Sequence, residues 1–245
     1  MLKRRNVIVT GASRGIGLEI SKALMECGWR VGLCVRDASV SGLDDVSQLV
    51  TDSDSKIFEV ELTDSESLTE LVKEVKHWSK GTLHGLVNNA GIAHGGLIQT
   101  TRLDDVRRTF EVNFFAVLNL TQRLHRYLRR ADGAAIVNLS SIASVQLTAG
   151  QVAYGVSKAS INALTKVMAQ EYRKNNILVN AILPAATNAG MSAEMDLPAL
   201  ELQISNMAHK ELISCRDIVF QTKILLDREI TGMTGQLIKI DNGIP

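Results

Sequence analysis

The feature that most constrains the fold of this 245-residue chain is a regular alternation of short apolar runs and longer segments with helical periodicity. Runs rich in Val, Ile and Leu that lack polar alternation are typical of strands buried on both faces. The runs predict strands at residues 7–10, 31–35, 56–60, 83–88, 134–139, 177–183 and 236–240. The segments between them predict helices at residues 16–27, 65–78, 103–130, 152–174 and 216–226. Strands that alternate with helices are joined by right-handed crossovers, so we expect a single Rossmann-type domain over residues 1–245, an α/β fold with a doubly wound, seven-stranded parallel sheet and helices on both faces.

Composition limits the classes of partner. A net charge of +1 gives no overall attraction to nucleic acid or to a membrane surface, and no apolar stretch is long enough to span a bilayer. The three cysteines, Cys27, Cys34 and Cys215, are odd in number and widely separated, which favours free thiols in a reducing compartment. We therefore expect a cytoplasmic protein that binds neither nucleic acid nor membrane.

The first predicted strand leads into a glycine-rich turn and then a helix. Gly11, Gly15 and Gly17 lie within the stretch from Thr10 to Gly17. Glycines let the backbone turn tightly and approach a pyrophosphate, and the N-terminus of the following helix favours its negative charge. The spacing differs from the G-x-G-x-x-G fingerprint, but its position between strand and helix still predicts a dinucleotide site.

A second motif places a phenol and an ammonium group on one helix face. Tyr154 and Lys158 are four residues apart, and Ser140 and Ser141 precede them by thirteen to fourteen residues. A nearby cation stabilises a phenolate, so we expect Lys158 to lower the pKa of Tyr154 and prepare it for proton transfer. Of the two serines, we expect Ser141 to face the site and Ser140 to face away.

Together these motifs resemble the short-chain dehydrogenase/reductase family, most closely its 3-oxoacyl-[acyl-carrier-protein] reductases. The stretch from Asn88 to Gly91 has the family's NNAG sequence, Asn113 and Ser141 stand at the family's distances from Tyr154, and residues 240–243 resemble its D-G-G ending. The resemblance implies a catalytic set of Asn113, Ser141, Tyr154 and Lys158, in which Asn113 anchors a water that feeds protons to the lysine. It also implies cofactor contacts from Gly11, Ser13, Arg14, Gly15, Ile16, Gly17, Arg36, Glu61, Leu62, Asn88, Ala90, Gly91, Tyr154, Lys158, Pro184 and Thr187.

The residues after the second strand favour NADP(H) over NAD(H). The family's NAD-selecting carboxylate position corresponds to Val35, and Arg36 follows it. Arg36 and Arg14 are suited to the 2′-phosphate of NADP, because charge-assisted guanidinium contacts to phosphate are strong. The alternative is that Arg36 is merely solvated and Asp37 binds the ribose hydroxyls of NAD.

The chain departs from the family after its sixth strand. Pro184 is followed by Ala185 where the family has glycine, and Ala189 takes the place of a threonine that contacts the cofactor, two residues before Met191. We expect Thr187 to substitute for that threonine, and residues 189–210 to form a substrate lid. Asn242 replaces a glycine near the end, a change that asparagine tolerates because it adopts positive φ more readily than most residues.

The substrate is less constrained. The resemblance implies a NADPH-dependent reductase of 3-oxoacyl thioesters with an acyl carrier protein as partner, but Asn175 stands where the family has a carrier-docking arginine, beside Arg173 and Lys174. Reduction of another ketone, oxidation of a secondary alcohol, and a non-catalytic NADP-binding sensor or scaffold stay open. Epimerases and dehydratases of the extended family usually have a further C-terminal domain and fit less well. The five histidines show no ligand spacing, so we expect no metal, and family members suggest a homotetramer or homodimer built on residues 103–130 and 152–174.

Overall fold

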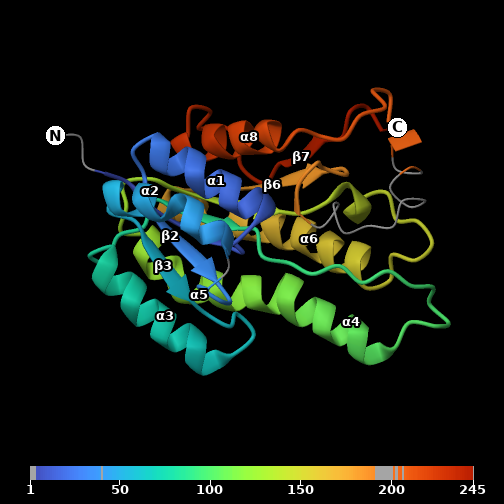
Figure 1. Cartoon of the computed structure of the whole chain (residues 1–245), viewed down its shortest axis with the longest axis horizontal. Helices are drawn as coiled ribbons and strands as arrows, with labels where there is room; N and C mark the ends of the chain where they lie inside the picture. The colour runs from blue at the N-terminus through green and yellow to red at the C-terminus, as the bar shows by residue number, and fades with distance from the viewer. Residues whose placement is uncertain (1–3, 40, 191–200, 202–203, 206, 245) are drawn as a thin grey trace.

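The computed structural model describes residues 4–39, 41–190, 201, 204–205 and 207–244. Its centre is a seven-stranded sheet in which every pair of neighbours is parallel, in the order β3-β2-β1-β4-β5-β6-β7. Figure 1 labels β3 and β2 near one edge of this sheet and β6 and β7 near the other. The strands are β1 (Asn6–Thr10), β2 (Arg30–Val35), β3 (Lys56–Glu59), β4 (Gly85–Asn88), β5 (Ala134–Leu139), β6 (Ile177–Pro184) and β7 (Leu237–Ile240). The predicted fold class is confirmed.

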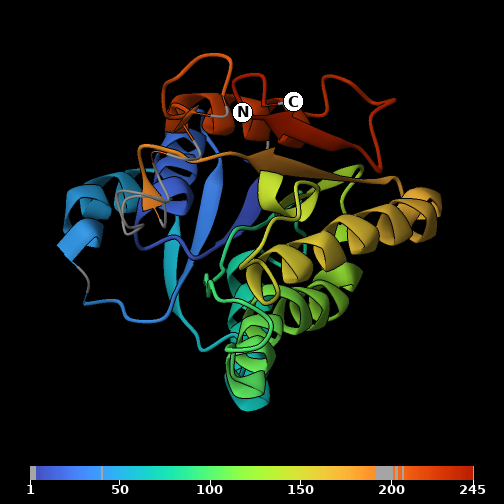
Figure 2. The ribbon, with the colours of Figure 1, turned by 90° about the vertical axis from the view of Figure 1, so that its right-hand side faces the viewer.

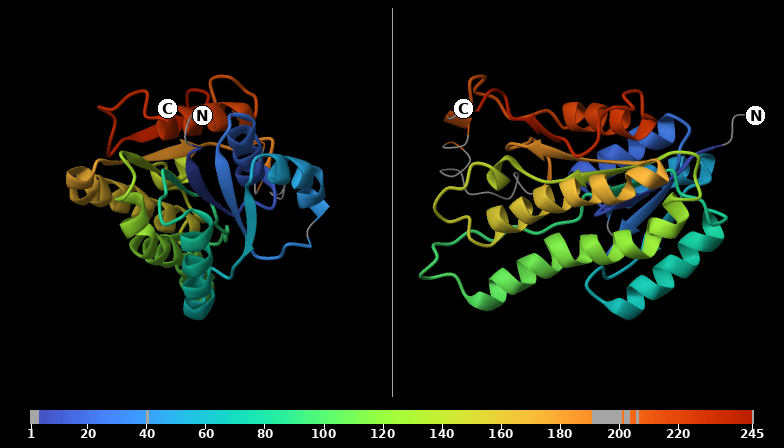
Figure 3. Two further views of the ribbon diagram at one scale, coloured as in Figure 1. Left: turned by 90° about the vertical axis from the view of Figure 1, so that its left-hand side faces the viewer. Right: turned by 180° about the vertical axis from the view of Figure 1, so that it is seen from behind.

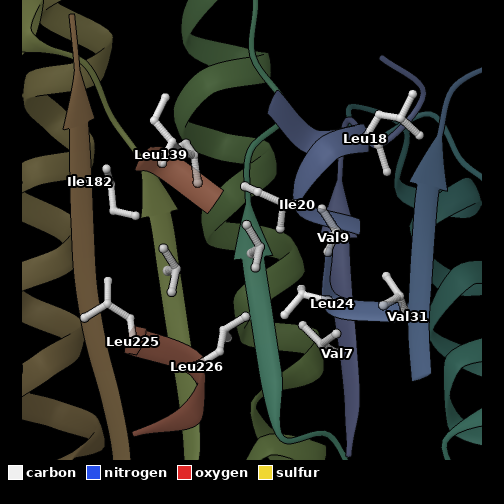
Figure 4. Packing of buried hydrophobic residues seen from close by; sticks show 14 of the residues in the cluster. Val7, Val9, Leu18, Ile20, Leu24, Val31, Leu139, Ile182, Leu225 and Leu226 are labelled. Carbon is white, nitrogen blue, oxygen red and sulfur yellow. The ribbon is translucent and has the colours of Figure 1, made fainter. Parts of the chain in front are cut away.

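Helices cover both faces of the sheet because the strands are apolar on both sides. Val7 and Val9 of β1 join one buried cluster, whereas Ile8 between them joins the other. The first face carries α1 (Gly15–Glu26), α2 (Ser47–Asp52) and α8 (Cys215–Asp227), and the second carries α3 (Ser65–Trp78), α5 (Ala116–Leu128) and α6 (Tyr154–Tyr172) (Figure 2). Figure 4 shows the first cluster, in which Leu24 of α1 and Leu226 of α8 pack over strands β1 and β4.

The strand order reverses direction at β1, as it does at ligand sites in doubly wound folds. The chain runs outward from β1 through β2 to β3, then returns to add β4 on the other side of β1. At such a reversal the loops after the two central strands separate, and ligands bind outside the carboxyl ends of the strands. The glycine turn after β1 and the NNAG stretch at the end of β4 therefore meet at this point.

The predicted helix over residues 103–130 is interrupted. It consists of α4 (Leu103–Phe110), a π-helical turn η2 (Glu111–Phe115) and α5, which run on from one another (Figure 3). Such π turns widen the hydrogen-bond ladder by one residue and are common at functional sites. Here the π turn contains Asn113, which the sequence had placed in the middle of a regular helix.

Short 3₁₀ segments complete the described secondary structure. They are η1 (Ser41–Val46), η3 (Ile142–Ser144) and η4 (Arg173–Asn175). Neither η1 nor α2 was predicted, and α6 begins at Tyr154 rather than at residue 152. Among the residues that the structure describes, no helix has both the length and the apolar character needed to cross a membrane.

Candidate functional site

The site is built at the carboxyl ends of β1, β4 and β5. Ser141 follows β5 and starts the turn η3, where its Oγ accepts a hydrogen bond from the Ala143 N–H at 3.2 Å. Tyr154 is the first residue of α6, and its side chain is hydrogen-bonded to that of Ser141. The structure thus brings together a hydroxyl and a phenol that are thirteen residues apart in the sequence.

Tyr154 differs from the prediction in its acid–base behaviour. Burial raises its pKa above the usual 10.0, and the Ser141 hydrogen bond offsets this only in part. The prediction that Lys158 lowers this pKa is wrong for this structure, because the Lys158 Nζ lies 6.0 Å from the centre of the tyrosine ring and donates its hydrogen bond elsewhere. Loss of solvation therefore dominates the pKa of Tyr154, and the phenol keeps its proton at neutral pH.

Lys158 lies one helical turn after Tyr154 and is 3% exposed. Its Nζ donates to the Leu139 carbonyl oxygen at the end of β5, at 2.7 Å. Burial lowers its pKa from 10.5 to about 8, because a desolvated ammonium group loses its proton more readily. This amine can exchange a proton close to neutral pH.

Asn113 fastens the π turn to the rest of the site. Its side chain is fully buried; Oδ1 accepts from the Ile92 N–H at 2.8 Å, and Nδ2 donates to the Ile92 carbonyl at 2.9 Å and to Ser157 Oγ at 3.0 Å. A Cβ placed on Gly91 would lie 3.2 Å from Asn113 Oδ1 and 3.3 Å from Lys158 Nζ. The four predicted catalytic residues therefore lie in one region, and the side chains of Asn113 and Lys158 both approach Gly91. The water-anchoring role of Asn113 stays a prediction.

Ser140 has a structural place, as expected from strand alternation. Its Oγ donates to the Lys158 carbonyl at 3.2 Å and is buried between β5 and α6. The neighbouring serine thus holds the helix that carries Tyr154.

The glycine turn is pinned to the NNAG stretch by two residues that the sequence analysis did not select. The Asn89 Nδ2 donates to the carbonyls of Thr10 and Gly11 at 2.9 and 3.0 Å. The Thr10 Oγ1 accepts hydrogen bonds from the backbone N–H groups of Asn89 and Ala90, each at 3.0 Å. A Cβ on Gly17 would lie 2.4 Å from Asn89 Nδ2 and 2.3 Å from the Gly11 oxygen, so only glycine allows this packing. The NNAG motif was the available signal for Asn89.

The helix after this turn suits an anionic group. Arg14 is the N-cap of α1 and makes no side-chain capping bond, and the first turn holds no acidic residue. Uncapped N–H groups and the helix dipole both attract a phosphate. Gly11 and Gly15 adopt φ of +64° and +56°, as a tight turn requires, while Ser13 in the turn and Ile16 at the start of α1 are partly exposed. These residues fit a pyrophosphate.

Asn88 does not line this path with its side chain. It is 3% exposed, and its Nδ2 donates to Asn138 Oδ1 at 2.8 Å on the adjacent strand. Asn138 in turn donates to Thr165 of α6. The Asn88 side chain thus joins β4, β5 and α6, and a cofactor contact from Asn88 stays a prediction, while Ala90 and Gly91 are partly exposed.

The outer rim at the ends of β2 and β3 is exposed and charged. The Asp37 carboxylate is held by Ser39, through its N–H at 2.8 Å and its hydroxyl at 2.7 Å, and these bonds lower the pKa of Asp37. The Glu61 carboxylate is held in the same manner by Thr63, whose hydrogen bonds lower the pKa of Glu61. Arg36 lies close enough to both carboxylates to lower these pKa values further. Both carboxylates are thus engaged locally, whereas Arg14 and Arg36 are exposed at the rim.

Leu62 lies behind this rim. It is partly buried and packs against the second apolar cluster. The predicted contact of Leu62 with an adenine remains a prediction.

The loop after β6 holds Thr187 in a local hydrogen bond. Thr187 is 2% exposed, and its Oγ1 donates to the carbonyl of Ala189 within its own loop. The cofactor contact from Thr187 stays a prediction. Pro184 is the buried last residue of β6, and a Cβ on Gly15 would lie 2.7 Å from the Gly190 Cα, so the loop packs directly on the glycine turn.

Other predicted features have mixed outcomes. Asn242 adopts φ of +51°, so the expected tolerance of asparagine there is confirmed. Asn175 contacts His125 at 3.1 Å, beside Arg173 and Lys174 in η4.

The predicted lid, residues 189–210, lies mostly outside the described residues, and Met191 lies outside them too. Among the described residues no cluster of His, Cys, Asp or Glu is arranged to hold a metal ion.

Comparison with known proteins gives consistent matches along the chain. A family model described as short chain dehydrogenase matches residues 5–198. A 3alpha-hydroxysteroid dehydrogenase of Mediterraneibacter gnavus is 29% identical, with 98% of this chain and 97% of the relative covered. A 3-oxoacyl-[acyl-carrier-protein] reductase of Thermotoga maritima is also 29% identical, with 99% and 98% covered. The crystal structure of a short chain dehydrogenase from Burkholderia cenocepacia in complex with NADP superposes with a TM-score of 0.90 at 28% identity, covering 98% of this chain and 97% of that one.

Proposed function

The chain belongs to the short-chain dehydrogenase family, oxidoreductases that act on CH–OH and C=O groups, and we propose that it is a NADPH-dependent reductase of ketones. The observation that carries the proposal is the hydrogen-bonded pair of Ser141 and Tyr154, with the buried Lys158 one turn further along α6. These three groups provide a hydrogen-bond donor, a proton and a source of replacement protons at one place.

We propose that the dinucleotide is held by the uncapped N-terminus of α1, the glycine turn and the exposed arginines Arg14 and Arg36. The relative from Burkholderia is in complex with NADP, and the two engaged carboxylates at the rim leave the arginines as the groups suited to a 2′-phosphate. When bound, the nicotinamide supplies a hydride to the carbonyl carbon.

The protein's own groups then act on the carbonyl oxygen. Ser141 donates a hydrogen bond to the oxygen as negative charge develops on it. Tyr154 transfers its phenolic proton to the same oxygen, so that hydride and proton together convert a C=O group to CH–OH. The raised pKa of Tyr154 keeps the phenol in the donating form at neutral pH. Lys158, one helical turn after Tyr154 and with a pKa of about 8, can return a proton to the phenolate.

We propose a 3-oxoacyl thioester as the substrate, with an acyl carrier protein as the partner that presents it. The support is the similarity to the Thermotoga reductase together with the basic residues Arg173 and Lys174 at the end of α6. The hydroxysteroid dehydrogenase of Mediterraneibacter is equally similar, so a cyclic ketone or secondary alcohol is the second candidate.

We also propose a homotetramer or homodimer in a reducing compartment such as the cytoplasm. Large apolar side chains on the helices predicted to form the interface are exposed, among them Leu103, Phe115 and Val167 at 60%, 48% and 51%. The three cysteines are free thiols, as expected for such a compartment.

The test follows NADPH absorbance with a panel of 3-oxoacyl thioesters, simple ketones, 3-oxosteroids and quinones. We expect the highest kcat/KM with a 3-oxoacyl thioester, and a higher value when the same acyl group is presented on an acyl carrier protein rather than on coenzyme A. Faster turnover of a steroid or simple ketone would replace the thioester as substrate. NADPH binding without turnover of any of these compounds would contradict the proposed reductase activity and favour a non-catalytic NADP-binding sensor.

A further inference from the structure

A buried hydrogen-bonded chain links the middle of α6 to the turn that carries Ser141. The Asn162 Nδ2 donates to Ser144 Oγ at 2.7 Å. Ser144 Oγ donates to the Ser141 carbonyl, which also accepts the Ser144 N–H at 3.0 Å. Asn162 and Ser144 are 7% and 5% exposed, so solvent does not compete for these bonds.

Asn162 shares a helix face with the reacting groups. It follows Lys158 by four residues and Tyr154 by eight, so the three side chains project from one side of α6. The turn η3 packs on the same helix, since a Cβ on Gly155 would lie 2.8 Å from the Ala143 carbonyl oxygen. The placement of Ser141 relative to Tyr154 therefore depends on how η3 is held against α6.

Stability alone does not account for an asparagine at this position. Its Oδ1 is buried and has no hydrogen-bond partner among the residues that the structure describes. A buried amide with an unmet acceptor is costly, and an apolar side chain of similar size avoids that cost. The benefit of the amide must come from the bond that Nδ2 makes to Ser144.

We propose that Asn162 is a positioning residue that, through Ser144, fixes the turn carrying Ser141 at the distance where Ser141 and Tyr154 act on one oxygen. The proposal rests on the reductase function proposed above. We call the hydrogen bonds from Asn162 to Ser144 and from Ser144 to the Ser141 carbonyl the clamp. Without the clamp, η3 can shift along α6 although Ser141 still has its hydroxyl. Asn162 would thus affect the reaction without touching the substrate.

The test compares Asn162→Leu and Ser144→Ala with Thr165→Val as the matched control. Thr165 is also a buried polar residue of α6, but it bonds to Asn138 of β5 rather than to η3. For both clamp variants we expect kcat to fall roughly tenfold, which is the loss of about one buried hydrogen bond, with KM for NADPH unchanged. We expect Thr165→Val to change kcat by less than about threefold, because it leaves the clamp intact. An equal loss in Thr165→Val would overturn the proposal.

A double variant separates positioning from general damage. If Asn162 acts only through Ser141, then Asn162→Leu should have little further effect on kcat in a Ser141→Ala background, because the group it places is gone. The same tenfold loss in both backgrounds would show an independent, merely structural role.

Hydrogen exchange keeps the test separate from the proposed function. Deuterium uptake is measured over residues 139–147 in the wild type and the three single variants. We expect faster exchange in this segment for Asn162→Leu and Ser144→Ala, and no change for Thr165→Val. If the wild type turns over no carbonyl substrate, the reductase function fails and this measurement alone decides whether Asn162 holds the turn; unchanged exchange in Asn162→Leu would refute it.

Discussion

The inner and outer parts of the candidate site are held in different ways. In the inner wall, Asn113, Ser141 and Lys158 are buried, and every one of them bonds to another part of the chain: to Ile92 and Ser157, to Tyr154, and to Leu139. The geometry of this wall is therefore a property of the folded core.

The outer rim is solvated instead. Arg14 and Arg36 are exposed, and the carboxylates of Asp37 and Glu61 accept hydrogen bonds from residues two positions further along the chain. Local hydrogen bonds tie up the negative groups, and the positive groups face the solvent.

The difference teaches how each part contributes to function. Buried groups act through fixed distances and shifted pKa values, so a small change in one of them has a large effect on the rate. Exposed charges act through attraction that water and salt weaken, so we expect each rim arginine to contribute modestly to affinity and mainly to affect which nucleotide is preferred.

The largest expected effect comes from removing the phenolic hydroxyl. Tyr154→Phe should lower kcat by about a thousandfold, because the ring and its packing stay while the proton donor is lost. Tyr172→Phe is the matched control, since it makes the same change at the other end of α6, and we expect its rate to stay within about twofold of the wild type. The measurement is steady-state NADPH oxidation; a Tyr154→Phe variant with its full rate would show that the inner wall is not the reacting part.

A smaller effect is expected from pH. Lys158 has a lowered pKa of about 8, so it is cationic below that pH and neutral above it, while the raised pKa of Tyr154 keeps the phenol protonated throughout this range. Reduction should be nearly constant below pH 8 and then fall by up to about tenfold per pH unit as the amine loses the proton it returns to Tyr154. The measurement is kcat for ketone reduction from pH 6 to pH 10.

Lys158→Arg is the control for the pH profile. An arginine stays protonated across the whole range, so this variant should be slower but should lack the break near pH 8. A break at the same pH in Lys158→Arg would show that another group causes it.

The smallest effect is expected at the rim. Arg36→Ala and Arg14→Ala should each raise KM for NADPH by roughly fivefold to tenfold, the value of one charge-assisted contact, and leave KM for NADH within about twofold. Arg107→Ala is the control, because it removes an exposed arginine of α4 that pairs with Asp104 and was not predicted to contact the cofactor. An equal rise in KM for NADPH and NADH would contradict the proposal that these arginines bind the 2′-phosphate. It would also show that the exposed rim does not select the nucleotide.

Much of the fold was predictable because most of the strands are rich in Val, Ile, Leu and Ala. Strand β5 was predicted to the residue, since Gly133 and Ser140 bound its run, and β6 was predicted to within one residue. The helix that contains Asn113 was not predicted correctly, because its sequence is helical throughout. The π turn follows from the bonds of Asn113 to Ile92 and Ser157, which come from other parts of the chain.

Site residues were predictable where they belong to a motif with fixed spacing. They were not predictable where a hydrogen bond to another part of the fold sets the role of the residue. The bond of the Thr187 hydroxyl within its own loop was not predicted. Asn89 was left out of the predicted site although it pins the glycine turn, and Asn162 carried no motif signal at all. In each case the partner is far away in the sequence or depends on how a loop folds back.

By itself the sequence determined the layered fold and the family, because apolar periodicity and motif spacing are local properties that survive without knowledge of the packing. It also placed Ser141, Tyr154 and Lys158 in one site. Only the tertiary structure decided their protonation and their support: burial raises the pKa of Tyr154 and lowers that of Lys158, and the clamp of Asn162 on Ser144 spans two elements. Solvent exclusion and contacts between distant residues exist only once the chain has folded, and they set the chemistry that the motif makes possible.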